Sequence, residues 1–161
     1  MAEPHQVLAA LAPAEARQAL LRCCGSRRWV EAMMAERPWA STEALQAAAE
    51  RIWQSMDRAD LLEAFAAHPR IGGGGATGWS GQEQAGVRDA GAETREALAA
   101  GNLDYFERHG FIFIVCATGK SAGEMLALLR GRLNNDTETE MKNAAAEQAK
   151  ITRLRLAKLA S

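Results

Sequence analysis

The chain has 161 residues, of which 48% are hydrophobic and 24% are charged, and its formal net charge at pH 7 is −1. This length fits a single domain over residues 1–161, with a core large enough to fold without metals or disulfides. A charge so near zero excludes partners that are held by bulk attraction, so we expect neither nucleic acid nor a membrane to bind.

Cysteine usage and the chain ends predict the compartment. The three cysteines form no CxxC pair and no Cys/His ligand set, so we expect reduced thiols and no metal site. No apolar run approaches twenty residues, and the first residues lack the basic start and apolar core of a signal peptide. The last three residues give no peroxisomal address. We therefore expect a cytoplasmic protein.

Helical periodicity fills the first 68 residues, with proline, glycine, serine and aspartate at the boundaries. The predicted helices run from Pro13 to Cys24, over residues 27–37, over residues 42–56 behind a Ser41 cap, and from Asp60 to His68. Glu63 completes a capping pattern with Asp60. His5 precedes these helices and is expected to be solvated.

The polar groups with the clearest chemical potential begin at His68. This residue is expected to close the fourth helix, because Pro69 prevents the helix from continuing. Gly72–Gly75 then predict a mobile turn, which is a candidate hinge for a lid. A catalytic imidazole and a structural histidine are both open interpretations of His68.

The next stretch combines a predicted helix with an extended segment. Ser80 and Glu83 match a capping box for a helix over residues 80–100, which Gly101 is predicted to end. Asn102 is expected to cap a short turn, and His109 to close it. Residues 111–117 (FIFIVCA) have the strongest β pattern, but no second convincing strand could pair with them, so we expect an extended buried segment.

The rest of the chain returns to helical periodicity. Ser121 and Glu124 form a second capping box for a helix that ends near Leu133, and a final long helix is predicted over residues 137–159. The sequence therefore predicts an all-α fold, a single compact helical domain with one extended buried segment near residues 111–117.

A phosphate-binding loop is one functional candidate, because Gly119, Lys120 and Ser121 follow an apolar run and precede a helix. The full pattern requires a glycine five residues before Gly119, where this chain has Ile114. The glycine-rich cradle of backbone amides is missing, so we do not expect nucleotide binding.

Five further motifs occur in a fixed order: HPRIG at 68–72, S-x-x-E-Q at 80–84, HGFIFIVCATG at 109–119, RLNN at 132–135 and KITRLRLAKL at 150–159. Together they resemble the 2-oxo-4-hydroxy-4-carboxy-5-ureidoimidazoline (OHCU) decarboxylase family of urate breakdown. The first third of the chain matches only in helical pattern, and the spacer before Ser80 is shorter and richer in glycine than in relatives. The resemblance implies an all-α homodimer that needs no cofactor and converts OHCU, a small ureidoimidazoline, to (S)-allantoin.

The resemblance also implies roles for individual residues. His68 matches the general acid/base, and Glu83 is assigned to catalysis with it. The positions that match substrate-holding residues are Pro69, Ser80, Gln84, the backbone of Ile114, Val115, Cys116, Ala117 and Thr118, and Arg155. Vertebrate members resemble peroxisomal proteins, whereas the end of this chain favours a cytoplasmic form.

Elementary chemistry agrees with this assignment. A decarboxylation needs an acceptor for the electron pair of the broken bond, and the ring imine of OHCU can be that acceptor without a cofactor. An imidazole such as that of His68 can deliver a proton near neutral pH.

The alternative is a helical interaction module without enzymatic activity. In that case Trp29, Trp39, Met33 and Met34 would form a face that binds a partner, although ordinary core packing is the simpler interpretation of these residues.

Overall fold

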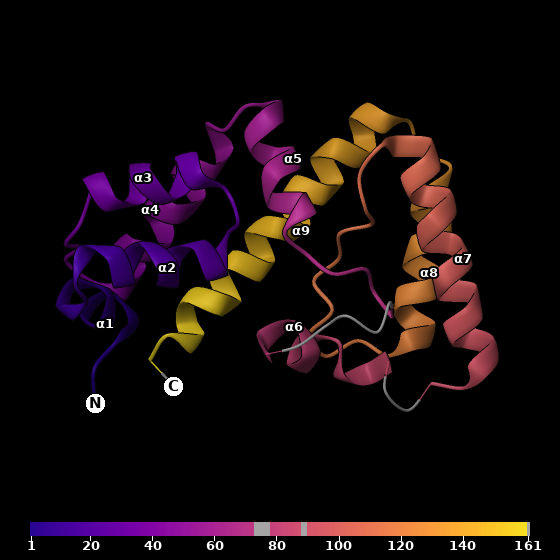
Figure 1. Ribbon diagram of the computed structural model, residues 1–161, viewed down its shortest axis with the longest axis horizontal. Coiled ribbons are helices and arrows are strands. Elements are labelled where there is room, and N and C mark those ends of the chain that lie inside the picture. Colours follow the sequence, from indigo (N-terminus) through magenta and orange to yellow (C-terminus); the bar gives the residue numbers. More distant parts are fainter. Residues whose placement is uncertain (73–77, 88–89, 161) are drawn as a thin grey trace. The chain divides into compact units, whose positions relative to one another are not determined.

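The structure, a computed structural model, describes residues 1–72, 78–87 and 90–160 (Figure 1). Its helices are α1 (Pro4–Ala10), α2 (Pro13–Cys23), α3 (Arg27–Ala35), α4 (Thr42–Gln54), α5 (Arg58–Ala66), α6 (Gly78–Glu83), the 3-10 helix η1 (Ala85–Val87), α7 (Ala92–His109), α8 (Ala122–Leu133) and α9 (Thr137–Lys158). No strand occurs within these ranges. The predicted all-α fold is confirmed.

The chain divides into two compact units. The terminal unit comprises residues 1–64 and 148–161, and the central unit comprises residues 65–147. Helices α5 and α9 contribute residues to both units. The single domain over residues 1–161 stays a prediction.

The core of the terminal unit is built from the apolar faces of its helices. Trp29 and Met33 are fully buried, Trp39 is 7% exposed, and the indole Nε1 of Trp29 donates to the Ala49 carbonyl at 3.1 Å. Trp29, Met33 and Trp39 are core, as the simpler interpretation predicted, whereas Met34 is half-buried and lines a groove on this unit. The last part of α9 joins this core, because Thr152 Oγ1 donates to the Cys23 carbonyl at 3.3 Å.

The core of the central unit combines aromatic rings with closely packed helices. The ring of Tyr105 lies 5.5 Å from that of Phe113 and 5.9 Å from that of Phe111. Helices α7 and α8 pack against each other at Gly101, where a Cβ atom would lie 2.5 Å from Leu129 Cδ2. Glycine at this position therefore allows the two helices to approach, and the prediction that it ends a helix is wrong.

Several predicted helix starts are confirmed. The side chain of Ser41 accepts a hydrogen bond from the Ala44 N–H, and Ser121 forms the predicted reciprocal box with Glu124. The predicted start of α5 is wrong by one turn: Asp57 accepts from the Asp60 N–H at 3.0 Å. The helix begins earlier because Asp57 is also a good cap.

The region around α6 and α7 differs most from the prediction. Helix α6 begins at Gly78, so Ser80 lies inside the helix and does not cap it. Helix α7 begins only at Ala92 and continues through Asn102, which was predicted to be a cap. The buried amide of Asn102 donates instead to the carbonyls of Ile71 and Leu98, at 2.8 and 2.9 Å.

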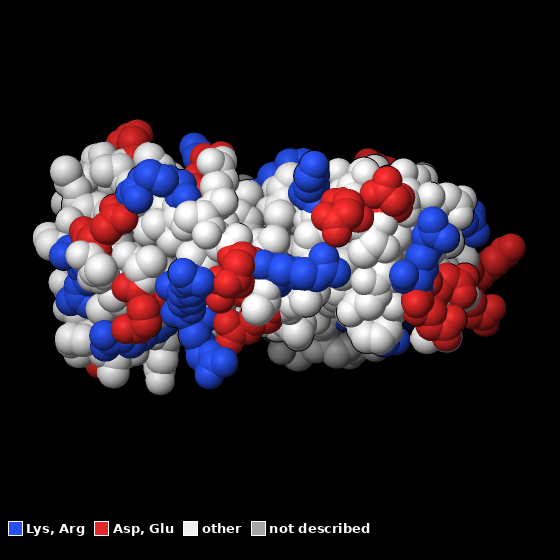
Figure 2. All heavy atoms as spheres, turned by 90° about the horizontal axis from the view of Figure 1, so that it is seen from above, with Lys and Arg blue, Asp and Glu red and all other residues white. Residues whose placement is uncertain are grey.

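The surface carries charges of both signs. On the face shown in Figure 2, lysine and arginine side chains are interspersed with aspartate and glutamate side chains. No helix in the described ranges is long and apolar enough to cross a membrane.

Candidate active site

Four of the five predicted motifs lie in the central unit. His68 and Pro69 follow α5, which ends at Ala66, so His68 does not itself end the helix as predicted. Ser80 and Glu83 belong to α6, and residues 114–118 lie between α7 and α8. The side chains of His68, Ser80 and Glu83 are all half-buried, a condition that allows contact with a small molecule.

One hydrogen bond joins the first two motifs. The N–H of Gly72 donates to Gln84 Oε1 at 3.0 Å, and Gln84 is 8% exposed. Gly72 has a φ of 73°, which favours glycine. The amide oxygen of Gln84, which was predicted to face the substrate, is thus used to hold HPRIG against the end of α6.

A close backbone contact lies just beyond the second and third motifs, between Gly86, two residues after Gln84, and Lys120, the residue after Gly119. A Cβ atom on Gly86 would lie 2.2 Å from the Lys120 carbonyl oxygen, so only glycine fits between η1 and the turn after residue 117. The amide of Asn102 also binds the carbonyl of Ile71, next to Gly72. The structure therefore joins HPRIG to S-x-x-E-Q directly, and it places the residue after the FIFIVCATG segment against η1, which follows S-x-x-E-Q.

The third motif is confirmed as a buried segment without helix or strand. Residues 113–117 are buried, Ile112 is half-buried and Thr118 is exposed. Several of its backbone groups are already bound: Arg132 Nη1 donates to the Ile114 carbonyl at 2.7 Å, and the Cys116 N–H donates to Glu147 Oε1 at 3.0 Å. Only part of this backbone is left for a ligand.

The buried carboxylate of Glu140 binds Arg132, the residue that donates to the Ile114 carbonyl of this segment. Glu140 is fully buried and forms an ion pair with Arg132 at 2.8 Å. Three further donors reach it: Tyr105 Oη at 2.6 Å, Asn135 Nδ2 at 2.9 Å and Asn143 Nδ2 at 2.7 Å. Sequence patterns recognised RLNN but gave it no role; here Arg132 and Asn135 of that motif hold Glu140.

Two other predicted or reactive groups lie in the terminal unit. Arg155 is buried, and its Nη1 donates to the Arg22 carbonyl at 3.0 Å. Burial raises the pKa of the Cys24 thiol to about 12, so this thiol stays protonated at neutral pH. Cys24 is therefore no candidate nucleophile.

The remaining histidines have structural partners. His109 is buried at the end of α7, where Nδ1 lies 2.9 Å from Thr137 Oγ1 and Nε2 lies 3.3 Å from the Leu133 carbonyl. His5 was expected to be solvated, but it is half-buried in α1 with Nδ1 3.1 Å from Thr42 Oγ1. Residues 73–75 of the predicted glycine hinge lie outside the described residues.

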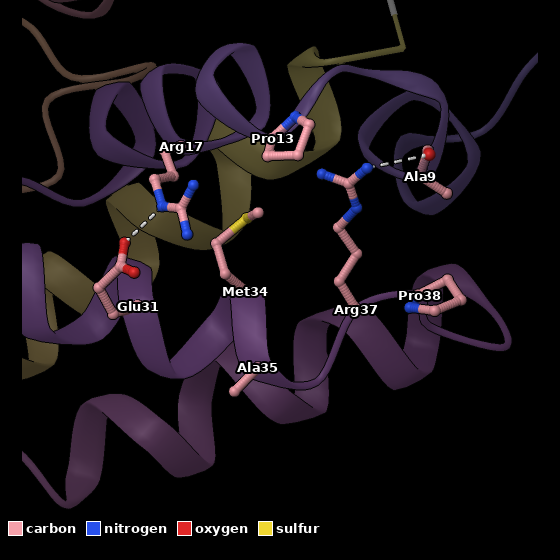
Figure 3. Close-up of a pocket in the computed structure, with 8 residues that line it drawn as sticks. All are labelled: Ala9, Pro13, Arg17, Glu31, Met34, Ala35, Arg37 and Pro38. Atoms are coloured by element: carbon pink, nitrogen blue, oxygen red, sulfur yellow. Dashed lines mark hydrogen bonds and ion pairs between the residues drawn. The ribbon is translucent and has the colours of Figure 1, made fainter.

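A groove of about 640 Å³ lies on the terminal unit, among residues of α1, α2 and α3 (Figure 3). Arg17 and Glu31 form an ion pair of 2.8 Å on one side of it, and Arg37 Nη2 donates to the Ala9 carbonyl on the other. No residue of the predicted site lines this groove, so the candidate active site lies elsewhere.

The helices of the described ranges define an all-α protein. Its candidate polar site combines a loop after α5, the short helix α6 and the non-helical segment between α7 and α8. The model of the OHCU decarboxylase family matches residues 9–157. The chain is a member of the OHCU decarboxylase family.

Individual relatives agree with this. The chain is 36% identical over 147 residues to the uric acid degradation bifunctional protein TTL of Arabidopsis thaliana, a match covering 86% of this chain and 45% of that protein. It is 34% identical over 134 residues to the 2-oxo-4-hydroxy-4-carboxy-5-ureidoimidazoline decarboxylase of Amia calva, covering 78% of this chain and 75% of that protein. The chain thus spans less than half the length of the Arabidopsis relative.

A solved structure is also similar. The crystal structure of an OHCU decarboxylase in the presence of (S)-allantoin matches with a TM-score of 0.78 and 37% sequence identity. The match covers 86% of this chain and 94% of that one.

Proposed function

We propose that this chain decarboxylates OHCU to (S)-allantoin without a cofactor. The observation that carries the proposal is the proximity of three family motifs in the central unit, which follows from the Gly72–Gln84 hydrogen bond and the contact of Gly86 with Lys120. A polar site with fixed backbone and half-buried titratable side chains suits a small, planar substrate that is rich in N–H and C=O groups.

The proposed reaction breaks the bond between the ring carbon and the carboxylate. Carbon dioxide leaves, the electron pair passes into the ring imine, and a proton added to one face of the ring sets the stereocentre. His68 is assigned the delivery of this proton, because an imidazole both binds and releases protons near neutral pH. Its segment is held in place by the bond between Gly72 and Gln84, which limits its movement.

The other predicted residues hold the substrate in this proposal. Glu83 orients the imidazole or accepts hydrogen bonds from the ureido group, and Ser80 lies one turn earlier on α6. Pro69 borders the imidazole. The N–H groups of Gln84 serve the substrate, since its oxygen already binds Gly72.

Arg155 is assigned to an anionic or carbonyl oxygen of the substrate by family resemblance. A guanidinium has five N–H donors, and the bond from Nη1 to the Arg22 carbonyl uses one of them. A homodimer located in the cytoplasm belongs to the same proposal, and light scattering of the purified protein tests the dimer.

The test generates OHCU from urate with urate oxidase and hydroxyisourate hydrolase. Faster loss of its ultraviolet absorbance, with optically active allantoin as the product, supports the proposal. Racemic allantoin formed at the uncatalysed rate contradicts it.

A further inference from the structure

The segment between α7 and α8 belongs to no helix or sheet that would bind its backbone N–H and C=O groups, and Figure 1 draws it as a tube without helix or arrow. Buried backbone groups need partners, so side chains must supply them. Three charged side chains do so: Arg132 binds the Ile114 carbonyl at 2.7 Å, Glu147 binds the Cys116 N–H at 3.0 Å, and Lys120 Nζ donates to the Cys116 carbonyl at 2.7 Å. We call these three side chains the clamp.

The clamp binds backbone groups of Ile114 and Cys116 but none of Val115, which lies between them. In an extended chain, successive residues turn their N–H and C=O groups toward opposite edges, and the clamp shows this alternation. Val115 is 4% exposed, yet its N–H and C=O make no hydrogen bond with any residue in the described ranges. A buried donor and acceptor, side by side on one residue, match the paired C=O and N–H of a ureide.

The clamp is itself held rigidly. The guanidinium of Arg132 is fixed by Glu140 at 2.8 Å and stacks over the Phe113 ring, with 4.6 Å between Cζ and the ring centroid. Glu140 is in turn held by Tyr105 at 2.6 Å. A backbone edge supported in this way can keep one orientation before the ligand arrives, which reduces the cost of binding.

We propose that Arg132, Glu147 and Lys120 are positioning residues that turn the N–H and C=O of Val115 toward the ureide group of the substrate. This inference rests on the proposed function. It assigns substrate recognition to one edge of residues 114–118 and gives the RLNN motif a role: Arg132 acts on the substrate only through the Ile114 carbonyl and the orientation of Val115.

The first experiment examines the clamp without relying on turnover. Amide hydrogen exchange and chemical shifts are measured by NMR in the wild type, Glu147→Ala, Glu147→Gln and Glu107→Ala, with (S)-allantoin as the added ligand. Glu107 is an exposed glutamate on α7. Its side chain makes no hydrogen bond or ion pair with the described residues, so it is the matched control.

The expected results are specific to single amides. Exchange at Cys116 should accelerate about tenfold or more in Glu147→Ala, and much less in Glu147→Gln, because glutamine keeps an acceptor oxygen. (S)-Allantoin should shift the Val115 amide of the wild type more than the Cys116 amide. A ligand shift at Cys116 with none at Val115 overturns the proposal.

The second experiment measures kcat and KM for OHCU in the same proteins. Glu147→Ala should raise KM about tenfold, with Glu147→Gln and Glu107→Ala within about threefold of the wild type. A lower kcat at unchanged KM would overturn the positioning role, because binding of the substrate would then not depend on Glu147. If the wild type itself does not accelerate OHCU decay, the proposed function fails, and the NMR result then decides the orientation of Val115 alone.

Discussion

His68 is the residue on which the proposed chemistry depends, and hydrogen bonds hold the backbone at this residue and further along its motif. Its N–H donates to the Phe65 carbonyl at 3.2 Å, and Gly72, further along the same motif, is bound to Gln84 at 3.0 Å. The imidazole is therefore carried by backbone that is fixed on both sides. A positioned general acid or base of this kind is worth roughly 10²–10⁴ in rate.

His68→Ala should accordingly lower kcat by a factor of roughly 10²–10⁴ and leave the thermal unfolding temperature nearly unchanged, since the side chain is half-buried. The coupled allantoin assay gives kcat, and circular dichroism gives the melting temperature. His5→Ala is the matched control, because His5 is also half-buried but lies in the terminal unit. Near-normal turnover by His68→Ala would remove the imidazole from the mechanism.

The sequence singled out candidate site residues but not the partners of their side chains. The pattern around His68, Ser80 and Glu83 singled them out, and the structure links the motifs that contain them. The sequence could not show that Gln84 Oε1 accepts a hydrogen bond from the Gly72 N–H, because an amide side chain binds a backbone N–H as readily as it binds a ligand. Which partner it takes depends on the path of the intervening chain, and no local pattern encodes that path.

At the scale of helices, the caps at Ser41 and Ser121 were predicted correctly, whereas those at Asp60 and Ser80 were not, and the packing roles of two α7 residues were missed. Ser41 and Ser121 were predicted as caps because a cap involves a backbone group only a few residues away. Gly101 and Asn102 were misread as a stop and a cap. Their roles, the approach of α8 and the bond to Ile71, depend on residues distant in sequence.

The two glycines Gly86 and Gly131 should respond to alanine in opposite ways. Gly131→Ala adds a methyl group to open space on α8 and should stabilise the protein by up to about 1 kcal/mol. Gly86→Ala forces a Cβ atom against the Lys120 carbonyl, so backbone must move, at a cost of roughly 1–3 kcal/mol. Urea denaturation measures both, and equal effects would contradict the close contact.

The buried Glu140 on α9 binds residues of α7 and α8, so its protonation makes the stability of this packing depend on pH. Burial alone would raise its pKa, but hydrogen bonds from Asn135, Tyr105, Asn143 and Arg132 outweigh burial and hold the pKa below the ordinary glutamate value. Because the pKa of Glu140 is lower in the folded than in the unfolded protein, its charged form stabilises the fold at pH values above the ordinary glutamate pKa. This contribution to stability is lost as the pH falls toward the folded pKa.

Glu140→Gln should therefore destabilise the protein at pH 7 by about 3 kcal/mol, because Arg132 loses its buried partner. The difference from the wild type should shrink as the pH falls below the ordinary glutamate pKa of 4.5, since the stabilisation by the wild-type carboxylate is lost as the pH approaches its lowered folded pKa. Denaturant titrations at several pH values measure this. Asp104, an exposed acid on α7, provides Asp104→Asn as the control, whose difference should stay small throughout. A Glu140→Gln difference that grows toward low pH would contradict the lowered pKa.

At the scale of the whole molecule, the two units are not independent stretches of chain. Helix α9 supplies Glu140 and Glu147 to the central unit, and Thr152, Arg155 and the fully buried Leu156 to the terminal unit. A helix forms cooperatively, so unfolding its first turns removes support from its last ones. The prediction of one domain over residues 1–161 can be tested through this shared helix.

Heating should produce one transition with the same midpoint by two probes. Three of the four tryptophans, Trp29, Trp39 and Trp53, lie in the terminal unit and Trp79 lies in the central unit, so tryptophan fluorescence reports mainly on the terminal unit, whereas circular dichroism reports on helices of both. Glu140→Gln weakens only the central unit directly. If α9 couples the units, this variant lowers both midpoints together, because two-state unfolding gives coincident transitions. A fluorescence midpoint that stays at the wild-type value while the circular dichroism midpoint falls would show two domains that unfold separately.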